Sequence, residues 1–141
     1  MPKKKDKVII DTNLWISYLL SKKASGLDKL FLEQSLSIQF SEELLNEFLE
    51  VVKRPKLKKY FANSDIEELL FQINLHANFV TVSSSIKICR DPKDNFLLSL
   101  AVDSKASFLL TGDKDLLELK KIEKTQILTL PQFLSKKGII R

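Results

Sequence analysis

Val8-Ile9-Ile10-Asp11-Thr12-Asn13 is the stretch that decides the predicted fold. Three β-branched residues in a row are typical of a strand buried on both faces, as in a parallel sheet covered by helices. We expect this strand to end at Asp11. In open α/β sheets ligands bind beyond the carboxyl ends of the strands, so this carboxylate is well placed for chemistry. Asp11 could equally serve as the cap of a turn, a role that Asp often has.

A second apolar run, Phe108-Leu109-Leu110-Thr111, ends in the same way, in Gly112-Asp113-Lys114-Asp115. Strand and helix patterns alternate between and around the two runs. We predict further strands at 36–40 (near a sheet edge), 79–82 and 124–128, and helices at 14–20, 27–34, 42–53, 64–76 (capped by Ser64), 92–102, 113–117 and 129–134. This alternation predicts an α/β fold, a three-layer α/β/α sandwich with a central parallel sheet and right-handed crossovers.

Composition indicates an ordinary globular protein, because 44% of the 141 residues are hydrophobic and 29% are charged. We expect residues 1–7 to be a basic, mobile tail and residues 8–141 to form a single domain. No apolar run approaches the roughly 18–20 residues that cross a membrane, and the N-terminus lacks the pattern of a signal peptide. The single cysteine, Cys89, fits a reducing cytoplasm, which is where we expect the protein.

The charge balance and the scarcity of soft ligands narrow the choice of partners. A net charge of +5 makes a polyanion such as nucleic acid a plausible partner. With one His and one Cys in the chain, we expect no tetrahedral zinc site. Any bound metal ion must therefore have oxygen ligands.

Four acidic residues are predicted to converge on one edge of the sheet. Asp11, Asp94 and Asp113 fall at strand-to-helix junctions, and Glu47 falls at the margin of the buried arc of its helix. Each has an alternative role as a helix cap, a first-turn acid or a solvated side chain. Two carboxylates 4 Å apart repel by roughly 1 kcal/mol in water and by about 4 kcal/mol at an effective dielectric of 20. Such a cluster shares protons or holds cations, and its oxygens suit Mg²⁺ or Mn²⁺, the ions used to cut phosphodiesters.

The densest basic segment covers residues 53–61 and ends in two aromatic residues. It is interpreted either as a loop that grips a nucleic-acid backbone or as a solvated connector between two helices. Its cations are Lys53, Arg54, Lys56, Lys58 and Lys59.

Four motifs follow one another along the chain: Asp11-Thr12-Asn13 after a hydrophobic strand, Glu47 within residues 43–48, Asp91-Pro92-Lys93-Asp94-Asn95, and the segment from Thr111 to Leu117. Taken together, these motifs resemble those of the PIN-domain nucleases. The order and strand-end context of the motifs carry the resemblance, which spans about residues 8–134. Within the family, the chain is most similar to the small bacterial and archaeal branch regarded as toxins of toxin–antitoxin pairs, the VapC-type ribonucleases.

The resemblance implies a Mg²⁺- or Mn²⁺-dependent endoribonuclease that leaves a 3′-hydroxyl and a 5′-phosphate. Asp11, Glu47, Asp94 and Asp113 would be the catalytic, metal-binding quartet, with Asp115 as an auxiliary ligand. The other implied site residues are Thr12, Asn13 and Thr111, which would orient carboxylates or water, and Lys53, Arg54, Lys56, Lys58 and Lys114, which would hold RNA. The resemblance also implies an antitoxin protein as partner and a homodimer.

Three rival functions come from other classes. A catalytically weak or inactive interaction module with the same fold would act by binding a partner protein or RNA. A phosphatase of the haloacid-dehalogenase type needs a second Asp two residues after Asp11, where this chain has Asn13. A phospho-accepting receiver domain needs an acidic pair near the first strand and a Lys after the last, and neither is evident.

Overall fold

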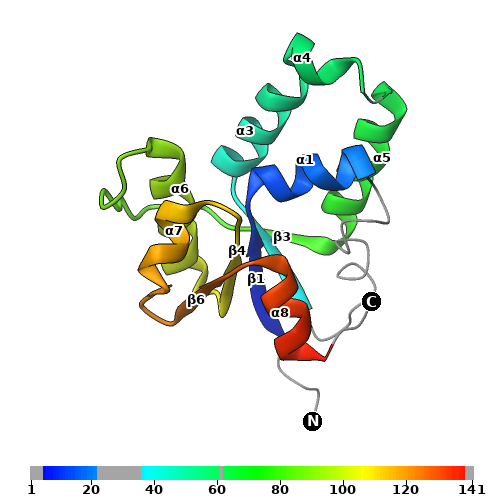
Figure 1. The fold of residues 1–141 in the computed structure, drawn as a ribbon. Helices are drawn as coiled ribbons and strands as arrows, with labels where there is room; N and C mark the ends of the chain where they lie inside the picture. The colour runs from blue at the N-terminus through cyan, green and yellow to red at the C-terminus, as the bar shows by residue number, and fades with distance from the viewer. Residues whose placement is uncertain (1–4, 22–35, 61, 139–141) are drawn as a thin grey trace.

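A computed structural model describes residues 5–21, 36–60 and 62–138, and its centre is a mostly parallel sheet (Figure 1). The described strands are β1 (Asp6–Ile10), β2 (Leu36–Phe40), β3 (Ala77–Phe79), β4 (Phe108–Leu110), β5 (Lys121–Ile122) and β6 (Thr125–Leu128). They form one six-stranded sheet in the order β3-β2-β1-β4-β6-β5, in which only β5 runs antiparallel to its neighbour. The predicted α/β fold with a parallel central sheet is confirmed.

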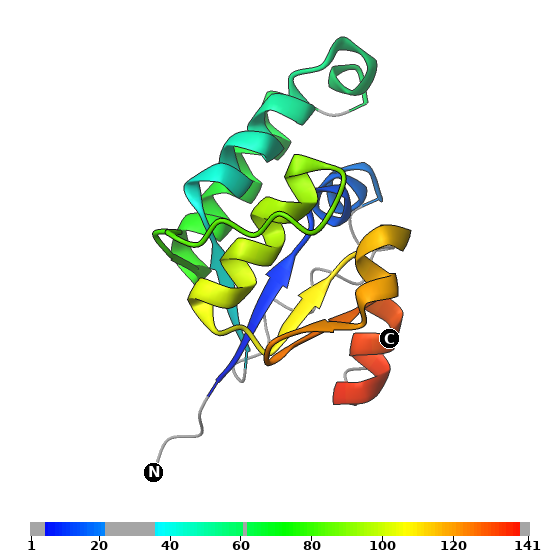
Figure 2. The same ribbon diagram turned by 90° about the vertical axis from the view of Figure 1, so that its left-hand side faces the viewer.

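Helices cover this sheet on both sides. Those described are α1 (Thr12–Ser21), α3 (Glu42–Val52), α4 (Pro55–Lys58), α5 (Asn63–His76), α6 (Pro92–Ser104), α7 (Lys114–Leu119) and α8 (Leu130–Lys137). Figure 2 shows α6 against one face of β1 and β4, with α8 on the opposite side. None of the helices within the described ranges combines the length and the apolar composition needed to cross a bilayer.

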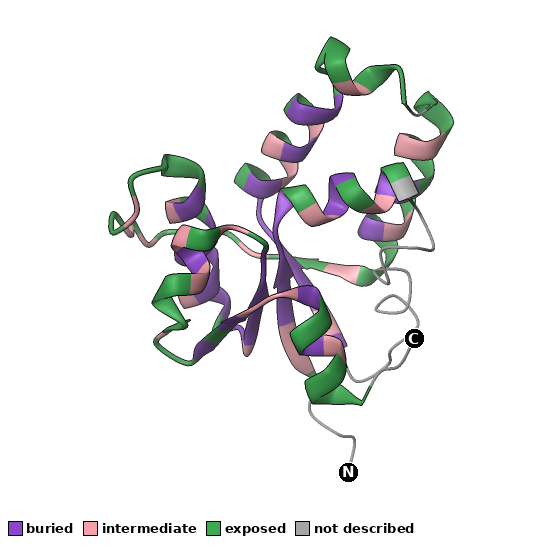
Figure 3. Ribbon diagram, viewed as in Figure 1, coloured by how far each residue is buried: buried purple, intermediate pink, exposed green. Residues whose placement is uncertain are grey.

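The core lies around the two central strands, which are buried on both faces (Figure 3). The β-branched run of β1 pairs in parallel with the apolar run of β4, with Ile10 opposite Leu110. Because the strands are in this register, the residues that follow them, Asp11 and Thr111, emerge side by side at the same sheet edge. Pairing continues one step further, since the Asp11 N–H donates to the Leu110 carbonyl at 3.0 Å.

Trp15 anchors α1 to the end of β1. Its side chain is completely buried, its Nε1–H donates to the Ile10 carbonyl at 3.1 Å, and its ring lies 5.5 Å from that of Phe40. This bond links the first turn of α1 to the residue immediately before Asp11. The helix therefore helps to fix where β1 ends and where the carboxylate of Asp11 lies.

One of two strand predictions was wrong in detail. The strand predicted near a sheet edge at 36–40 is confirmed as β2, which lies next to the edge strand β3. The strand predicted at 79–82 is shifted to Ala77–Phe79. The last bond to β2 runs from the Val80 N–H to the Phe40 carbonyl, at 2.8 Å, and β2 then gives way to the cap of α3. Within the described ranges, residues 81 and 82 consequently have no neighbouring strand.

Helix and strand starts also differ from the prediction at several places. The carboxylate of Asp65 accepts from the Ala62 N–H at 3.1 Å, so α5 begins at Asn63 rather than after a Ser64 cap. The basic segment of residues 53–61 contains the short helix α4. Strand β1 begins at Asp6, whose carboxylate forms an ion pair with Lys137. The helix predicted at 27–34 lies outside the described residues.

Candidate metal centre

Asp11 and Thr111 form the buried part of the site, at the ends of the two central strands. Only 6% of Asp11 is exposed, and its carboxylate Oδ2 accepts a hydrogen bond from Thr111 Oγ1 at 2.7 Å. The same Thr111 oxygen accepts from the Asp113 N–H at 3.0 Å. The buried hydroxyl of Thr111 therefore binds both the carboxylate of Asp11 and the backbone of Asp113.

Asp94, Asp113 and Asp115 bring three further carboxylates together from the first turns of two helices. Asp113 caps α7, where its Oδ1 accepts from the N–H groups of Asp115, at 2.8 Å, and Leu116, at 3.3 Å. Asp94 lies in the first turn of α6 and is only 5% exposed. Each of the three acids offers one oxygen, and these oxygens all lie within 4.8 Å of one another.

Burial and the charges of neighbouring acids make Asp11 and Asp94 costly to ionise. Burial raises the pKa of Asp94 to about 6, and the charges of Asp113 and other nearby acids add to the effect. Burial also raises the pKa of Asp11, with a further contribution from the charge of Glu47, against the opposing effect of the Thr111 hydrogen bond. A cation bound between these groups would remove the repulsion.

The donor set fits a hard divalent cation. All three gathered ligands are carboxylate oxygens, the type that such ions prefer. Thr12 adds a second observation, because its Oγ1 is buried beside Asp11 and has no hydrogen-bond partner among the described residues. The centre thus combines carboxylates that repel one another with a buried hydroxyl, on the residue after Asp11, that lacks a hydrogen-bond partner among the described residues.

The remaining predicted site residues lie at varying distances from the carboxylates. Glu47 is half-buried on α3 and acts electrostatically on Asp11, but it is not one of the three gathered acids. Asn13 and Lys114 are exposed at the starts of α1 and α7. The basic residues Lys53, Arg54, Lys56 and Lys58 are exposed at or beyond the far end of α3 (Figure 1). Lys53 follows Glu47 by six residues of α3, a rise of about 9 Å along the helix.

Sequence reasoning missed Arg90 and gave no role to Asn95. The Arg90 guanidinium forms an exposed ion pair with Asp115, with 3.2 Å between Nη2 and Oδ2. The Asn95 side chain accepts from the Cys89 N–H at 2.8 Å and donates to the Cys89 carbonyl at 3.0 Å. The only signal for either residue was its position beside the motif Asp91–Asp94.

Comparison with known proteins places the chain in a family. The family model for the PIN domain matches residues 7–115, a span that contains every carboxylate described above. The chain belongs to the PIN-domain family. An uncharacterized protein of Methanocaldococcus jannaschii is 35% identical over 124 residues, which cover 85% of this chain and 79% of that protein. PIN domains are typically metal-dependent nucleases, and this PIN domain has an acidic cluster that can hold a metal ion.

Thr111 offers a direct test of how the buried acids of this PIN domain are positioned. Thr111→Val keeps the side-chain volume but removes the hydroxyl that donates to Asp11 and accepts from the Asp113 N–H. We expect the affinity for Mn²⁺, measured by calorimetry, to fall by about 10- to 100-fold, the usual effect of losing a group that orients a ligand. Thr111→Ser retains the hydroxyl and should bind Mn²⁺ nearly as well as wild type. Equal affinity in the Val variant would show that Thr111 does not position the site.

The raised pKa of Asp94 predicts how stability depends on pH. Its folded pKa is about 6, against an ordinary value of 3.8, so the folded state binds this proton more tightly than the unfolded state. The resulting stabilisation is complete below about pH 4 and is lost as the pH rises through about 6. In EDTA, we expect the difference in melting temperature between pH 5 and pH 7.5 to be larger for wild type than for Asp94→Asn. Identical pH profiles for the two proteins would contradict the assignment.

Proposed function

We propose that this PIN domain is a Mg²⁺- or Mn²⁺-dependent endoribonuclease that hydrolyses RNA phosphodiester bonds. The observation that carries the proposal is the meeting of Asp94, Asp113 and Asp115 within 4.8 Å beside buried Asp11. Membership of the family and the net charge of +5 support the same conclusion. In this proposal Glu47 is the fourth acid of the quartet, and the support for it is the effect of its charge on Asp11.

The residues of this chain have separable roles in that reaction. Asp94, Asp113 and Asp115 would hold the divalent ion together with Asp11. When bound, such an ion neutralises phosphate charge and acidifies water, the chemistry that phosphodiester hydrolysis requires. Asp113 uses Oδ1 to cap α7, which leaves Oδ2 without a hydrogen bond among the described residues. The burial of Asp11 and Asp94 excludes water and strengthens their electrostatic interactions.

Cations around the acidic centre would hold the RNA backbone. Lys114 is exposed on the first turn of α7, next to Asp113. The basic segment around α4 begins about 9 Å beyond Glu47 along α3, so a strand bound at both places would have to span more than one nucleotide. In this proposal, Lys53, Arg54, Lys56 and Lys58 contribute affinity rather than chemistry.

The chemical nature of the products tests the proposed reaction. End-labelled RNA and DNA of one sequence should be incubated with the protein and Mn²⁺, with EDTA as the control. We expect RNA to be cut into fragments with a 3′-hydroxyl and a 5′-phosphate, because water is the nucleophile. A 2′,3′-cyclic phosphate product would contradict the proposal, since it requires attack by the ribose 2′-hydroxyl instead.

We further propose that the protein is the toxin of a toxin–antitoxin pair and acts in the cytoplasm. In this role it would bind an antitoxin protein and form a homodimer. The support for this role is the likeness of the motifs to that branch of the family, together with exposed apolar side chains such as Tyr60 and Leu75. Expression of wild type, but not of Asp94→Asn, should arrest growth of a bacterial host. Light scattering of the purified protein would test the dimer.

One observation favours the alternative of an inactive interaction module. Arg90 already neutralises Asp115, one of the three gathered acids, without any metal ion. Calorimetry with Mn²⁺ distinguishes the two functions, because an inactive module has no need to bind the ion. Binding accompanied by cleavage would exclude the module.

A further inference from the structure

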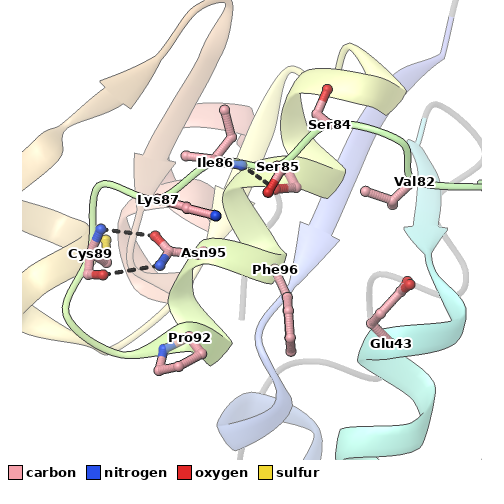
Figure 4. A pocket seen from close by; sticks show the side chains of 11 residues that line it. Glu43, Val82, Ser84, Ser85, Ile86, Lys87, Cys89, Pro92, Asn95 and Phe96 are labelled. Carbon is pink, nitrogen blue, oxygen red and sulfur yellow. Dashed lines mark hydrogen bonds between the residues drawn. The ribbon is translucent and has the colours of Figure 1, made fainter.

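A cavity of about 430 Å³ opens beside the acidic centre, between α3, α6 and the segment of residues 80–91 (Figure 4). Its volume is within the range of small-molecule sites. Pro92, Asn95 and Phe96 line it from one face of α6, whereas Asp94 lies on another face of that helix. Cys89 lies in the lining, and the next residue, Arg90, pairs with Asp115 of the acidic centre. One end of the cavity therefore borders the site proposed to cut RNA.

Helix α6 holds the outer wall of this cavity in place. Residues 81–90 belong to no helix or strand, so their backbone polar groups need other partners. Asn95, Ser99 and Asp103, spaced four residues apart on α6, accept hydrogen bonds from this backbone at 2.6 to 3.0 Å. The donors are the N–H groups of Ser83, Ser84, Ile86 and Cys89. The wall is thus fixed before any ligand binds.

The lining combines an aromatic face with unpaired polar groups. The Phe96 ring is 48% exposed and projects into the space between α6 and α3, while Glu43 lies across that space on the first turn of α3 (Figure 4). Lys87 contributes a cation from the wall. No hydrogen bond or ion pair occupies the side chains of Glu43, Ser85 or Lys87 within the part of the chain that the structure describes.

We propose that this cavity is a nucleobase subsite, which binds one base of the RNA next to the phosphate at the acidic centre. The subsite rests on the proposed nuclease function and adds specificity to it. The base stacks on Phe96, a contact that every base can make because each has a π-face. The base edge donates to Glu43, since an ionised carboxylate can only accept.

Glu43 gives the subsite a preference among the four bases. Guanine carries an N1–H and an exocyclic amino group side by side, and these can donate in parallel to both oxygens of one carboxylate. Uracil offers a single N–H that lies between two carbonyl groups. The oxygens of these carbonyl groups are repelled by the carboxylate oxygens, because both kinds of oxygen accept hydrogen bonds. We therefore expect the cavity to select guanine over uracil.

Binding of short RNA to the Asp94→Asn protein in EDTA, where cleavage is not expected, tests the subsite. Fluorescence anisotropy with pentaribonucleotides that contain either one guanine or only uracil gives the two affinities. Adding Phe96→Ala should weaken guanine binding by about tenfold, whereas Phe96→Tyr retains stacking and should stay within about twofold. Phe71→Ala is the matched control, because this ring is 61% exposed on α5 and does not line the cavity.

A second pair of variants tests the base preference. Glu43→Gln should abolish the preference for guanine over uracil, because the amide presents only one acceptor oxygen. Glu42→Gln, on the neighbouring exposed residue that does not line this cavity, should leave the preference unchanged. An unchanged preference in Glu43→Gln would overturn the assignment of Glu43.

The outcomes separate this proposal from the nuclease proposal. If wild type cleaves RNA and Phe96→Ala cleaves it with unchanged KM and base preference, the subsite is overturned and the nuclease stands. If no variant cleaves but guanine binding still depends on Phe96, the subsite stands and the nuclease fails. If Phe96→Ala releases a bound protein partner and leaves RNA affinity unaltered, the cavity is a protein-docking site and the subsite is overturned.

Discussion

Asp94→Asn is expected to slow Mn²⁺-dependent RNA cleavage by about 10²–10³-fold, the effect typical of removing one electrostatic group from a catalytic centre. Asp94 is the most deeply buried of the three gathered carboxylates. An amide of the same shape cannot supply its charge to a divalent cation. The rate should be measured with excess enzyme on a labelled RNA, so that the cleavage step is observed directly.

The same substitution should not unfold the protein. The pKa of Asp94 is raised to about 6, so its ionised form is unfavourable in the fold at neutral pH. Asp94→Asn removes that repulsion, and its melting temperature in EDTA at pH 7.5 should equal or exceed that of wild type. Glu118→Gln, an exposed carboxylate on α7, is the matched control and should retain full activity. Undiminished cleavage by Asp94→Asn would remove Asp94 from the site.

Trp15→Ala is expected to lower the free energy of unfolding by about 3–5 kcal/mol, the range for deleting a buried aromatic side chain. The variant loses a completely buried indole, its contact with Phe40 and the hydrogen bond to the Ile10 carbonyl. Urea unfolding followed by circular dichroism measures the change. Much of the protein should be unfolded at 37 °C if the wild-type stability is typical of its size.

Leu20→Ala is the matched control for Trp15, because it removes a large apolar side chain from the same helix where 47% of it is exposed. Its effect should stay within about 0.5–1 kcal/mol. Trp15→Phe should fall between the two, since it keeps a ring but loses the N–H donor. A loss below 1 kcal/mol in Trp15→Ala would show that α1 is not anchored through this residue.

The central fold could be predicted because its signals are local. The apolar runs of β1 and β4 are long enough to be recognised, and each is followed by residues that begin a helix. The position of β3 could not be predicted in the same way, because its end depends on where its neighbour β2 stops. β5 was not predicted, since Lys121-Ile122 is too short to show a period.

The parts of the candidate site that depend on local sequence could also be predicted, and the parts that depend on the path of a distant segment could not. Asp94 and Asp113 were predicted from their positions at helix starts, and the structure brings both into one group with Asp115. The ion pair of Arg90 and the wall of the cavity were not predicted, because both depend on the path of residues 81–90. That path is set by side chains on α6, and no periodic pattern in the segment itself reports it.

The hydrogen bond between Asp11 and Thr111 joins residues that are 100 positions apart in the chain. A growing polypeptide on the ribosome would carry Asp11 long before it carried Thr111, Asp113 or Asp115. Until β4 and the residues after it have been synthesised and β4 has paired with β1, the partial product lacks Asp113 and Asp115, two of the three clustered acids. It also lacks the Thr111 hydroxyl that orients Asp11. For the proposed ribonuclease, this order of synthesis means that the messenger and the ribosome that produce it are spared until translation is nearly complete.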